Sequence, residues 1–189
     1  FYTNDYALTC DTLKSNTSLA RTINTGSSQV SLSAFEVDGN GLTLETANSE
    51  LIFAGGSEYL YKTGNLNATF SKFTIFDARD LFVQSSFTTD SLKLSTGSAF
   101  VLKQGKTVDI NALQADGNCG DFIHIRSYCP DEMYVWPDEN CINQMPVIQA
   151  SSDVTASYLK IGFVKAQSAN FIANNSYAEG AADGWTITQ

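Results

Sequence analysis

The single histidine is the first residue to consider for chemistry. With one histidine, His124, among 189 residues, neither a histidine-based metal cluster nor a Ser-His-Asp triad has a recognisable set of partners. Side chains alternate along a β-strand, so His124 is expected to point away from Ile123 and Ile125, toward solvent. We therefore interpret His124 as an ordinary strand residue.

Paired carboxylates, the groups that cleave glycosidic bonds, are the next candidates. Asp77 and Asp80 flank Arg79 in the run FDARDLF. In an enzyme built of stacked β-coils, the two carboxylates would lie on adjacent coils, separated in sequence by the length of one coil. Asp90 is 13 residues from Asp77 and 10 from Asp80, which does not match the coil length derived below. Asp109 follows Asp90 by 19 residues, in stacking register, yet like charges are common in exposed corners. We expect no catalytic residue and no enzyme, with a polysaccharide-cleaving enzyme as the less favoured alternative.

Two short loops share features with calcium loops. Asp38 begins the sequence DGNG, and Asp116 begins DGN. An EF-hand needs an oxygen ligand at its fifth position and glycine at its sixth, whereas Leu42 and Thr43 occupy these positions after Asp38. Asp and Asn are common in β-corners, so we expect no metal and no cofactor.

Aromatic pairs are candidates for binding sugar rings. Tyr59 and Tyr61 share one face of a predicted strand, where they form either part of the core or an exposed platform. Tyr134 and Trp136 lie in an acidic stretch that contains two prolines, and they are the better candidates for a platform. We expect a partner contact first at this stretch.

That stretch, CPDEMYVWPDENCINQMP at 129–146, is predicted to be a surface insertion. Cys129 and Cys141 enclose 11 residues, and a disulfide between them would stabilise the fold by about 3 kcal/mol. We favour this pairing, with Cys119–Cys129 as the alternative. Cys10 is distant in sequence and is expected to be unpaired or paired outside this chain. Three neighbouring cysteines favour an oxidising location.

Charge and composition exclude two classes of partner. The 20 acidic and 11 basic residues give a formal net charge of −9, so a nucleic-acid backbone would be repelled. No run approaches the roughly 18 apolar residues of a membrane span, and we expect no membrane insertion. The chain begins with Phe1 and no signal-peptide pattern follows, so we take it as a processed chain or an excised piece.

The elements that would position these residues are short β-strands. Helical periodicity is almost absent, whereas apolar and polar residues alternate in segments bounded by Gly, Asn, Asp or Ser. The predicted strands are at 42–44, 51–53, 73–75, 81–83, 92–94, 108–110, 122–125 and 158–161. All three prolines lie within 129–146, which fits a hydrogen-bonded ladder over the rest of the chain.

The spacing of these strands predicts a solenoid. Each of three pairs, Phe73 and Leu92, Leu81 and Phe100, and Leu51 and Phe70, is 19 residues apart; Leu42 and Leu60 are 18 apart, and Leu92 and Val108 are 16 apart. A nearly constant period is typical of a fold in which each coil stacks on the one before it. The prediction is one all-β domain over 1–189, a right-handed parallel β-helix with coils of about 19 residues and one acidic, cysteine-flanked insertion.

Two long stretches carry a family resemblance. GKTVDINALQADGNCGDFIHIRSYC and ASYLKIGFVKAQSANFIANNSYAEGAADGW contain a G-T turn, an A-x-G-x-C step, an I-x-I-x-S strand, the run A-x-S-A-x-F-x-A-x-N-S and the end G-W-x-I. These elements fall on Gly105 and Thr107, on Ala115, Gly117 and Cys119, on Ile123, Ile125 and Ser127, on 166–176 and on 184–187. From Gly105 to its last residue, the chain resembles β-helical repeat regions of large secreted and cell-surface proteins of Bacteroidota, including giant adhesins of gliding cells exported by type IX secretion.

The resemblance implies a function and a location. It implies a non-catalytic structural and adhesive segment of an extracellular cell-surface protein, a stiff rod that displays loops for attachment. The implied partners are neighbouring domains of the same large protein, surface glycans or another cell-surface protein. A carbohydrate-binding module and a filament subunit remain alternatives. The acidic insertion replaces the short turn usual in the family.

Smaller features follow from the same resemblance. Thr12 and Ser91 stand in Asp-Thr-Leu and Asp-Ser-Leu, which match the short O-glycan acceptor motif of exported Bacteroidota proteins. In the family, the Gly-Trp element marks the end of one β-helical unit. Trp185 is also large enough to cover an open coil end, which a solenoid needs in order to avoid edge pairing.

Overall fold

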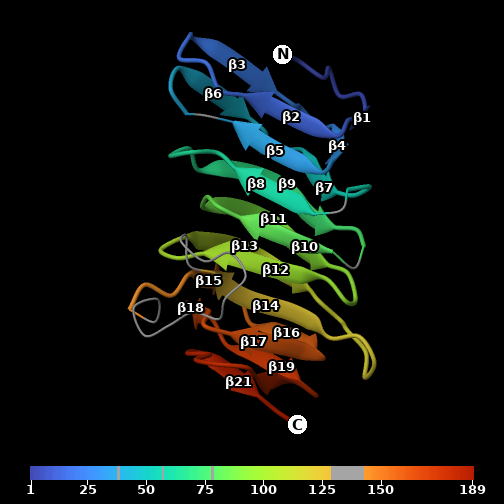
Figure 1. The fold of residues 1–189 in the computed structure, drawn as a ribbon, viewed down its shortest axis with the longest axis vertical. Helices are drawn as coiled ribbons and strands as arrows, with labels where there is room; N and C mark the ends of the chain where they lie inside the picture. The colour runs from blue at the N-terminus through green and yellow to red at the C-terminus, as the bar shows by residue number, and fades with distance from the viewer. Residues whose placement is uncertain (38, 57, 78, 129–142) are drawn as a thin grey trace.

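The chain forms a column of stacked β-coils (Figure 1). The computed structural model describes residues 1–37, 39–56, 58–77, 79–128 and 143–189. These residues form about seven turns of a parallel β-solenoid with coils of about 21 residues. They include no helix, and thus no helix of the length and apolarity that crossing a bilayer requires.

The strands belong to four sheets in which every pairing is parallel. One eight-stranded sheet has the order β1 (Leu8–Thr9), β4 (Gln29–Leu32), β7 (Glu50–Phe53), β9 (Ala68–Ile75), β11 (Phe87–Leu94), β13 (Thr107–Gln114), β15 (Val147–Ala150) and β18 (Lys165–Gln167). The other has the order β2 (Thr12–Ser15), β5 (Ala34–Val37), β8 (Tyr59–Lys62), β10 (Asp80–Val83), β12 (Ala99–Lys103), β14 (Ile123–Tyr128), β17 (Leu159–Gly162) and β20 (Tyr177–Ala178). The two smaller sheets are β16 (Val154–Ser157), β19 (Phe171–Asn174) and β21 (Trp185–Ile187), and β3 (Arg21–Asn24) with β6 (Leu42–Glu45). Every predicted strand lies within or overlaps one of these elements.

The three longest strands, β9, β11 and β13, bend around a corner of the column. In β11 the buried residues are Phe87 and Thr89 before the bend and Leu92 and Leu94 after it, so the alternation shifts by one residue at the bend. The pairing with both neighbouring strands skips Asp90, which occupies the corner. One sheet can therefore cover two sides of the column.

Polar side chains stack at this corner from coil to coil. The Asn111 side-chain amide donates a hydrogen bond to Asp90 (2.8 Å), and the Ser151 hydroxyl donates one to Asn111 (2.8 Å). Each of these three coils thus places a short polar residue at the corner, and these side chains form hydrogen bonds with one another along the column axis.

The expected coil period is right for some coils, too short for others and too long at the C-terminal end, where Val154 lies beside Phe171 and Phe171 beside Trp185. Phe73 lies beside Leu92 and Leu81 lies beside Phe100, which confirms two of the pairs expected from the sequence. The other expected pairs are wrong, because Leu51 lies beside Phe73 and not Phe70, Leu42 beside Arg21 and not Leu60, and Leu92 beside Leu113 and not Val108. Register follows the inward-facing side chains, while the corners between strands vary in length.

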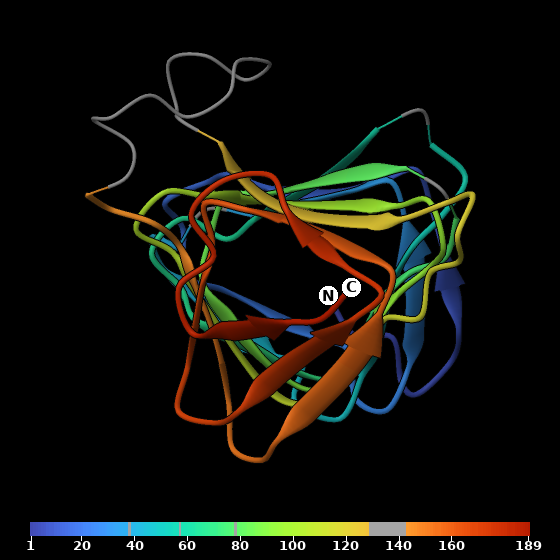
Figure 2. The same cartoon turned by 90° about the horizontal axis from the view of Figure 1, so that it is seen from below.

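The core changes in composition along the column. The coils from β5 to β12 are filled by buried rings, namely Phe35, Phe53, Tyr59, Tyr61, Phe70, Phe73, Phe87 and Phe100. From β15 onward the described core is aliphatic except for Phe171, with residues such as Ile148, Ala150, Val154, Ala156, Ile161 and Ala173. The C-terminal coils are also narrower than those behind them (Figure 2).

At the C-terminal end of the column, the half-buried Trp185 packs against the core. The Trp185 ring packs on Phe171 with 5.0 Å between ring centroids, and its indole N–H donates to the carbonyl of Val164 (3.2 Å). Gly184 precedes it with φ +78°, and a Cβ there would lie 2.1 Å from the carbonyl oxygen of Ala166. Only glycine fits this position, which brings Trp185 onto the last coil.

Most of the predicted insertion at 129–146 falls outside the described residues. Residues 129–142, with Cys129, Cys141 and the Tyr134 and Trp136 pair, lie outside the described residues. At the described end of this stretch, Met145 is buried and the Pro146 carbonyl accepts a hydrogen bond from the Lys165 amide, so these two residues pack on the column. The strand before the interruption ends at Tyr128, whose ring packs on Phe82 with centroids 5.8 Å apart.

Candidate functional site

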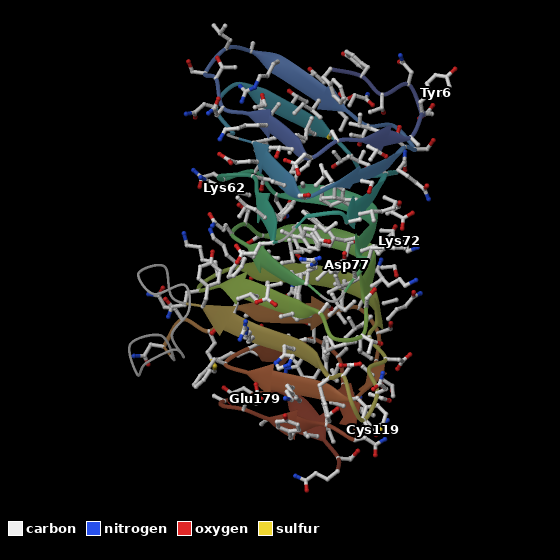
Figure 3. The ribbon with its side chains drawn as sticks, turned by 45° about the vertical axis from the view of Figure 1, so that its right-hand side comes forward. Tyr6, Lys62, Lys72, Asp77, Cys119 and Glu179 are labelled. Atoms are coloured by element: carbon white, nitrogen blue, oxygen red, sulfur yellow. The ribbon has the colours of Figure 1, made fainter. Side chains whose placement is uncertain are left out.

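A cleft crosses three successive corners at the ends of β9, β11 and β13. It has a volume of about 580 Å³, within the usual range for small-molecule sites. Its lining residues are Phe76, Asp77, Lys93, Leu94, Ser95, Thr96, Gln114 and Asp116. Figure 3 shows Asp77 midway along the column, away from both ends.

The strands set the positions of the lining residues. Lys93 and Gln114 are paired in register on adjacent strands and are both exposed, while Leu94 and Ala115 after them are buried. One residue after Leu94 and one residue after Ala115, the backbone turns away at a corner of the column. Alternation in neighbouring strands therefore places polar side chains from different coils beside one another.

Hydrogen bonds between corners hold the walls of the cleft. The Ser95 hydroxyl lies within hydrogen-bonding distance of the carbonyls of Ile75 (2.7 Å) and Phe76 (2.9 Å), one coil earlier. The Thr96 hydroxyl donates to the carbonyl of Asp116 (3.2 Å), one coil later. The three corners are thus tied to one another.

Phe76 gives the cleft an unusual apolar surface. Its side chain is 68% exposed, although it directly follows the buried Ile75. The other large hydrophobic residues that are exposed in the described parts of the chain all lie in the first coil, at Phe1, Tyr2, Tyr6 and Leu19. Among the described residues, Phe76 thus gives the cleft an exposed aromatic ring that a ligand could contact.

Asp77 is held in place at one side of the cleft. The Tyr59 hydroxyl donates a hydrogen bond of 2.6 Å to one carboxylate oxygen, and the Arg79 Nε lies 4.0 Å from the other. Burial, and then this hydrogen bond to a carboxylate, raise the pKa of Tyr59 to about 12. The carboxylate is therefore a fixed hydrogen-bond acceptor.

Three other polar groups of the cleft are available to a ligand. Within the described parts of the chain, no side chain forms an ion pair or hydrogen bond with the side chains of Lys93, Gln114 or Asp116. Together they offer an ammonium donor, an amide that both donates and accepts, and a carboxylate acceptor.

A second group of polar and aromatic residues lies on the outer face of β14, β17 and β20. The Lys160 ammonium lies 5.4 Å from the Phe122 ring centroid and 5.2 Å from that of Tyr177. Glu179 contacts both Lys160 and His124, each at 3.8 Å. These groups pair with one another, so this cluster explains the stability of the face rather than the binding of a ligand.

His124 is a strand residue on the outer face, as expected, but it is not fully in solvent. Its side chain is 30% exposed. Burial is the largest influence and lowers the pKa of His124, against the opposing effect of the Glu179 carboxylate. The neutral imidazole is thus favoured.

The aspartates weighed for sugar cleavage do not form an acid and base pair. Asp77 lines the cleft, whereas Asp80 forms an ion pair with Arg126 (3.0 Å) and is not part of the lining. The expected stacking of Asp90 on Asp109 is wrong, because Thr88 lies beside Asp109. The bend in β11 shifts the register at Asp90, where Asn111 is its partner.

The remaining predicted positions have structural roles. Tyr59 and Tyr61 are buried in the core, which excludes the platform interpretation for this pair. In the loop after Asp116, the Asn118 side-chain oxygen accepts hydrogen bonds from the amides of Gly120 and Asp121, as in a polar corner. The described residues contain no group of three or more His, Cys, Asp or Glu that could hold a metal ion, and Asp38 lies outside them.

Cysteines and glycan acceptors were the last sequence candidates. Cys10 and the exposed Cys119 are free thiols, so the Cys119–Cys129 alternative is not formed, and the favoured Cys129–Cys141 pair lies outside the described residues. Thr12 is exposed, as a glycan acceptor must be. The Ser91 hydroxyl is buried, so the folded chain offers no access for a glycan there.

Sequence reasoning missed the Phe76 cleft. One local signal was present, since two adjacent apolar residues, Ile75 and Phe76, cannot both face inward at the end of an alternating strand. The contribution of Lys93, Gln114 and Asp116 had no such signal, because it depends on which coils are neighbours.

Comparison with known proteins adds no relative. No protein-family model, no curated protein and no solved structure matches the chain.

Proposed function

We propose that the chain is a non-catalytic structural and adhesive segment of an extracellular cell-surface protein, a stiff rod that presents a binding surface on its side. The single observation that carries this proposal is the unbroken parallel pairing of eight strands in one sheet, from β2 to β20. Backbone hydrogen bonds along the whole column resist bending, as in other solenoids.

Other observations support attachment as the role of this rod. The Phe76 cleft lies on the side of the column, where it stays accessible when domains are joined at the ends. The net charge of −9 opposes adsorption to nucleic acid and to anionic lipid. The resemblance to adhesin repeat regions of Bacteroidota points to the same location outside the cell, with neighbouring domains and surface glycans as partners.

An attachment assay tests the proposal. Microspheres coated with the 189-residue chain are allowed to settle on mucin, on glass and on bacterial cells, and are then exposed to increasing flow. We expect them to remain on at least one surface at a shear that removes albumin-coated spheres. Equal detachment from all surfaces would contradict an adhesive role.

A carbohydrate-binding module is the second candidate, and the cleft is the observation that favours it.

The enzyme alternative has a separate test: the chain is incubated with neutral and acidic polysaccharides, and new reducing ends are measured. We expect none above the background without protein, and a sustained release would replace the proposal with a hydrolytic activity.

A further inference from the structure

We propose that the Phe76 cleft binds a neutral saccharide, with the Phe76 ring stacked on one face of a sugar. The proposal rests on the attachment function above and names the class of ligand that this surface takes.

The exposed ring supplies the apolar part of the contact. One face of many pyranose rings presents C–H groups, which pack on an aromatic face and remove apolar area from water. The Phe76 side chain is 68% exposed and borders the cleft, so its ring is open to such a contact. A purely polar ligand would leave this ring unused.

The polar groups match hydroxyls rather than a single charge. A sugar hydroxyl both donates and accepts, and the cleft offers donors in Lys93 and Gln114 and acceptors in Gln114, Asp116 and Asp77. Asp77 is fixed by Tyr59, and the corners are fixed by the Ser95 and Thr96 hydroxyls. The backbone of the cleft and Asp77 therefore need little ordering on binding, whereas the exposed Lys93 and Gln114 side chains must be ordered.

Charge selects neutral sugars over acidic ones. Two carboxylates and one ammonium line the cleft, and the whole chain carries a formal charge of −9. An anionic polysaccharide would be repelled at long range. The cleft spans three coils, about 10 Å along the column at the usual strand spacing, which is long enough for more than one sugar unit.

The test is a titration of the folded chain with the neutral sugars cellobiose, maltose and lactose and with the charged polymers polygalacturonate and polylysine, followed by calorimetry and by ligand-detected NMR. Phe76→Ala removes the stacking ring, and Tyr6→Ala is the matched control, since Tyr6 is 76% exposed in the first coil (Figure 3). We expect saturable binding of at least one sugar, weakened at least about tenfold in Phe76→Ala and unchanged within about twofold in Tyr6→Ala. Circular dichroism of each variant checks that its fold is retained.

Several results would overturn the inference. These are binding of none of the three sugars up to about 10 mM, equal binding by Phe76→Ala, or Phe76-dependent binding only of polygalacturonate or of polylysine. The proposed function is judged separately by the microsphere assay. Attachment without sugar binding would retire only the inference, whereas sugar binding without attachment would retire only the adhesive role.

Discussion

The middle coils and the C-terminal coils share one architecture and differ in length and in what fills them. Between β7 and β9, one coil runs from Leu51 to its stacked partner Phe73, and most of the buried side chains there are aromatic rings. Between β16 and β19 the coil from Val154 to Phe171 is shorter, and the next one, from Phe171 to Trp185, is shorter still.

The difference shows how a solenoid matches the volume of its core side chains to the number of residues in each coil. Strand spacing along the axis is nearly constant, so a coil with fewer residues encloses less area and less volume. Close packing then requires smaller side chains, and the narrow coils bury Ala156 and Ala173 among mainly aliphatic residues, whereas the wide coils bury several rings. Two predictions test this relation by substitution, and two more compare the wide coils with the C-terminal half through pH, from the largest expected effect to the smallest.

Phe73→Ala should destabilise the wide coils most. The Phe73 ring is fully buried and lies 4.2 Å from the Phe87 ring centroid and 5.3 Å from that of Phe53. Removing it leaves a cavity that costs about 3–5 kcal/mol of unfolding free energy. Urea unfolding measures the loss, and Phe76→Ala, which removes the same ring from an exposed position, should change stability by less than about 0.5 kcal/mol.

Ala173→Leu should destabilise the narrow coils by the opposite mechanism. Ala173 is fully buried in β19, between its stacked partners Ala156 and Ile187. Added methylenes must displace neighbours in a closely packed core, at a cost of about 1–3 kcal/mol. Ile172→Leu, on the adjacent outward position, is the control. A stable Ala173→Leu variant would show that the narrow coils have spare volume.

Alkaline pH should weaken the wide coils through Tyr59. Because the folded pKa is raised from 10.0 to about 12, stability is fully present below pH 10 and is lost as pH rises toward 12. Tyr59→Phe should remove this group's share of the pH dependence and cost about 1 kcal/mol at neutral pH through the lost hydrogen bond to Asp77. Urea unfolding midpoints of both proteins, measured between pH 10 and pH 12, test this prediction. If stability falls with pH equally steeply in Tyr59→Phe, the raised pKa does not belong to Tyr59.

Acidic pH should have a smaller effect on the C-terminal half through His124. Burial lowers its pKa below the ordinary value of 6.5, with Lys160 and Arg126 acting in the same direction and Glu179 and Asp80 against. Stability is then present above pH 6.5 and is lost as pH falls through the folded pKa. An NMR titration of the imidazole should give a midpoint below 6.5, and a higher midpoint would mean that the Glu179 contact dominates.

The strands were predictable from the sequence because alternation is local. The inward positions Leu81, Val83, Phe100 and Leu102 are buried, and their strands pair at the expected spacing. A constant period failed where corners lengthen the coil, as in the long step between the stacked partners Phe35 and Tyr61. Corner length leaves no periodic trace, so counting residues could not locate these pairs.

The candidate site was much less predictable. Asp77 was singled out for chemistry with Asp80, but only Asp77 borders the cleft. Phe76 was not singled out, although its position after Ile75 requires it to face outward. The sequence favoured aromatic residues at Tyr134 and Trp136, which lie outside the described residues, and that hypothesis stays a prediction.

By itself, the amino-acid sequence determined that this chain forms short strands with one apolar face each, because alternation and turn residues act over a few positions. Only the tertiary structure decided which corners lie beside one another. Phe76, Lys93 and Asp116 come from three different coils and meet because register is set by core packing. A cleft assembled across coils therefore depends on coil lengths that local patterns do not encode.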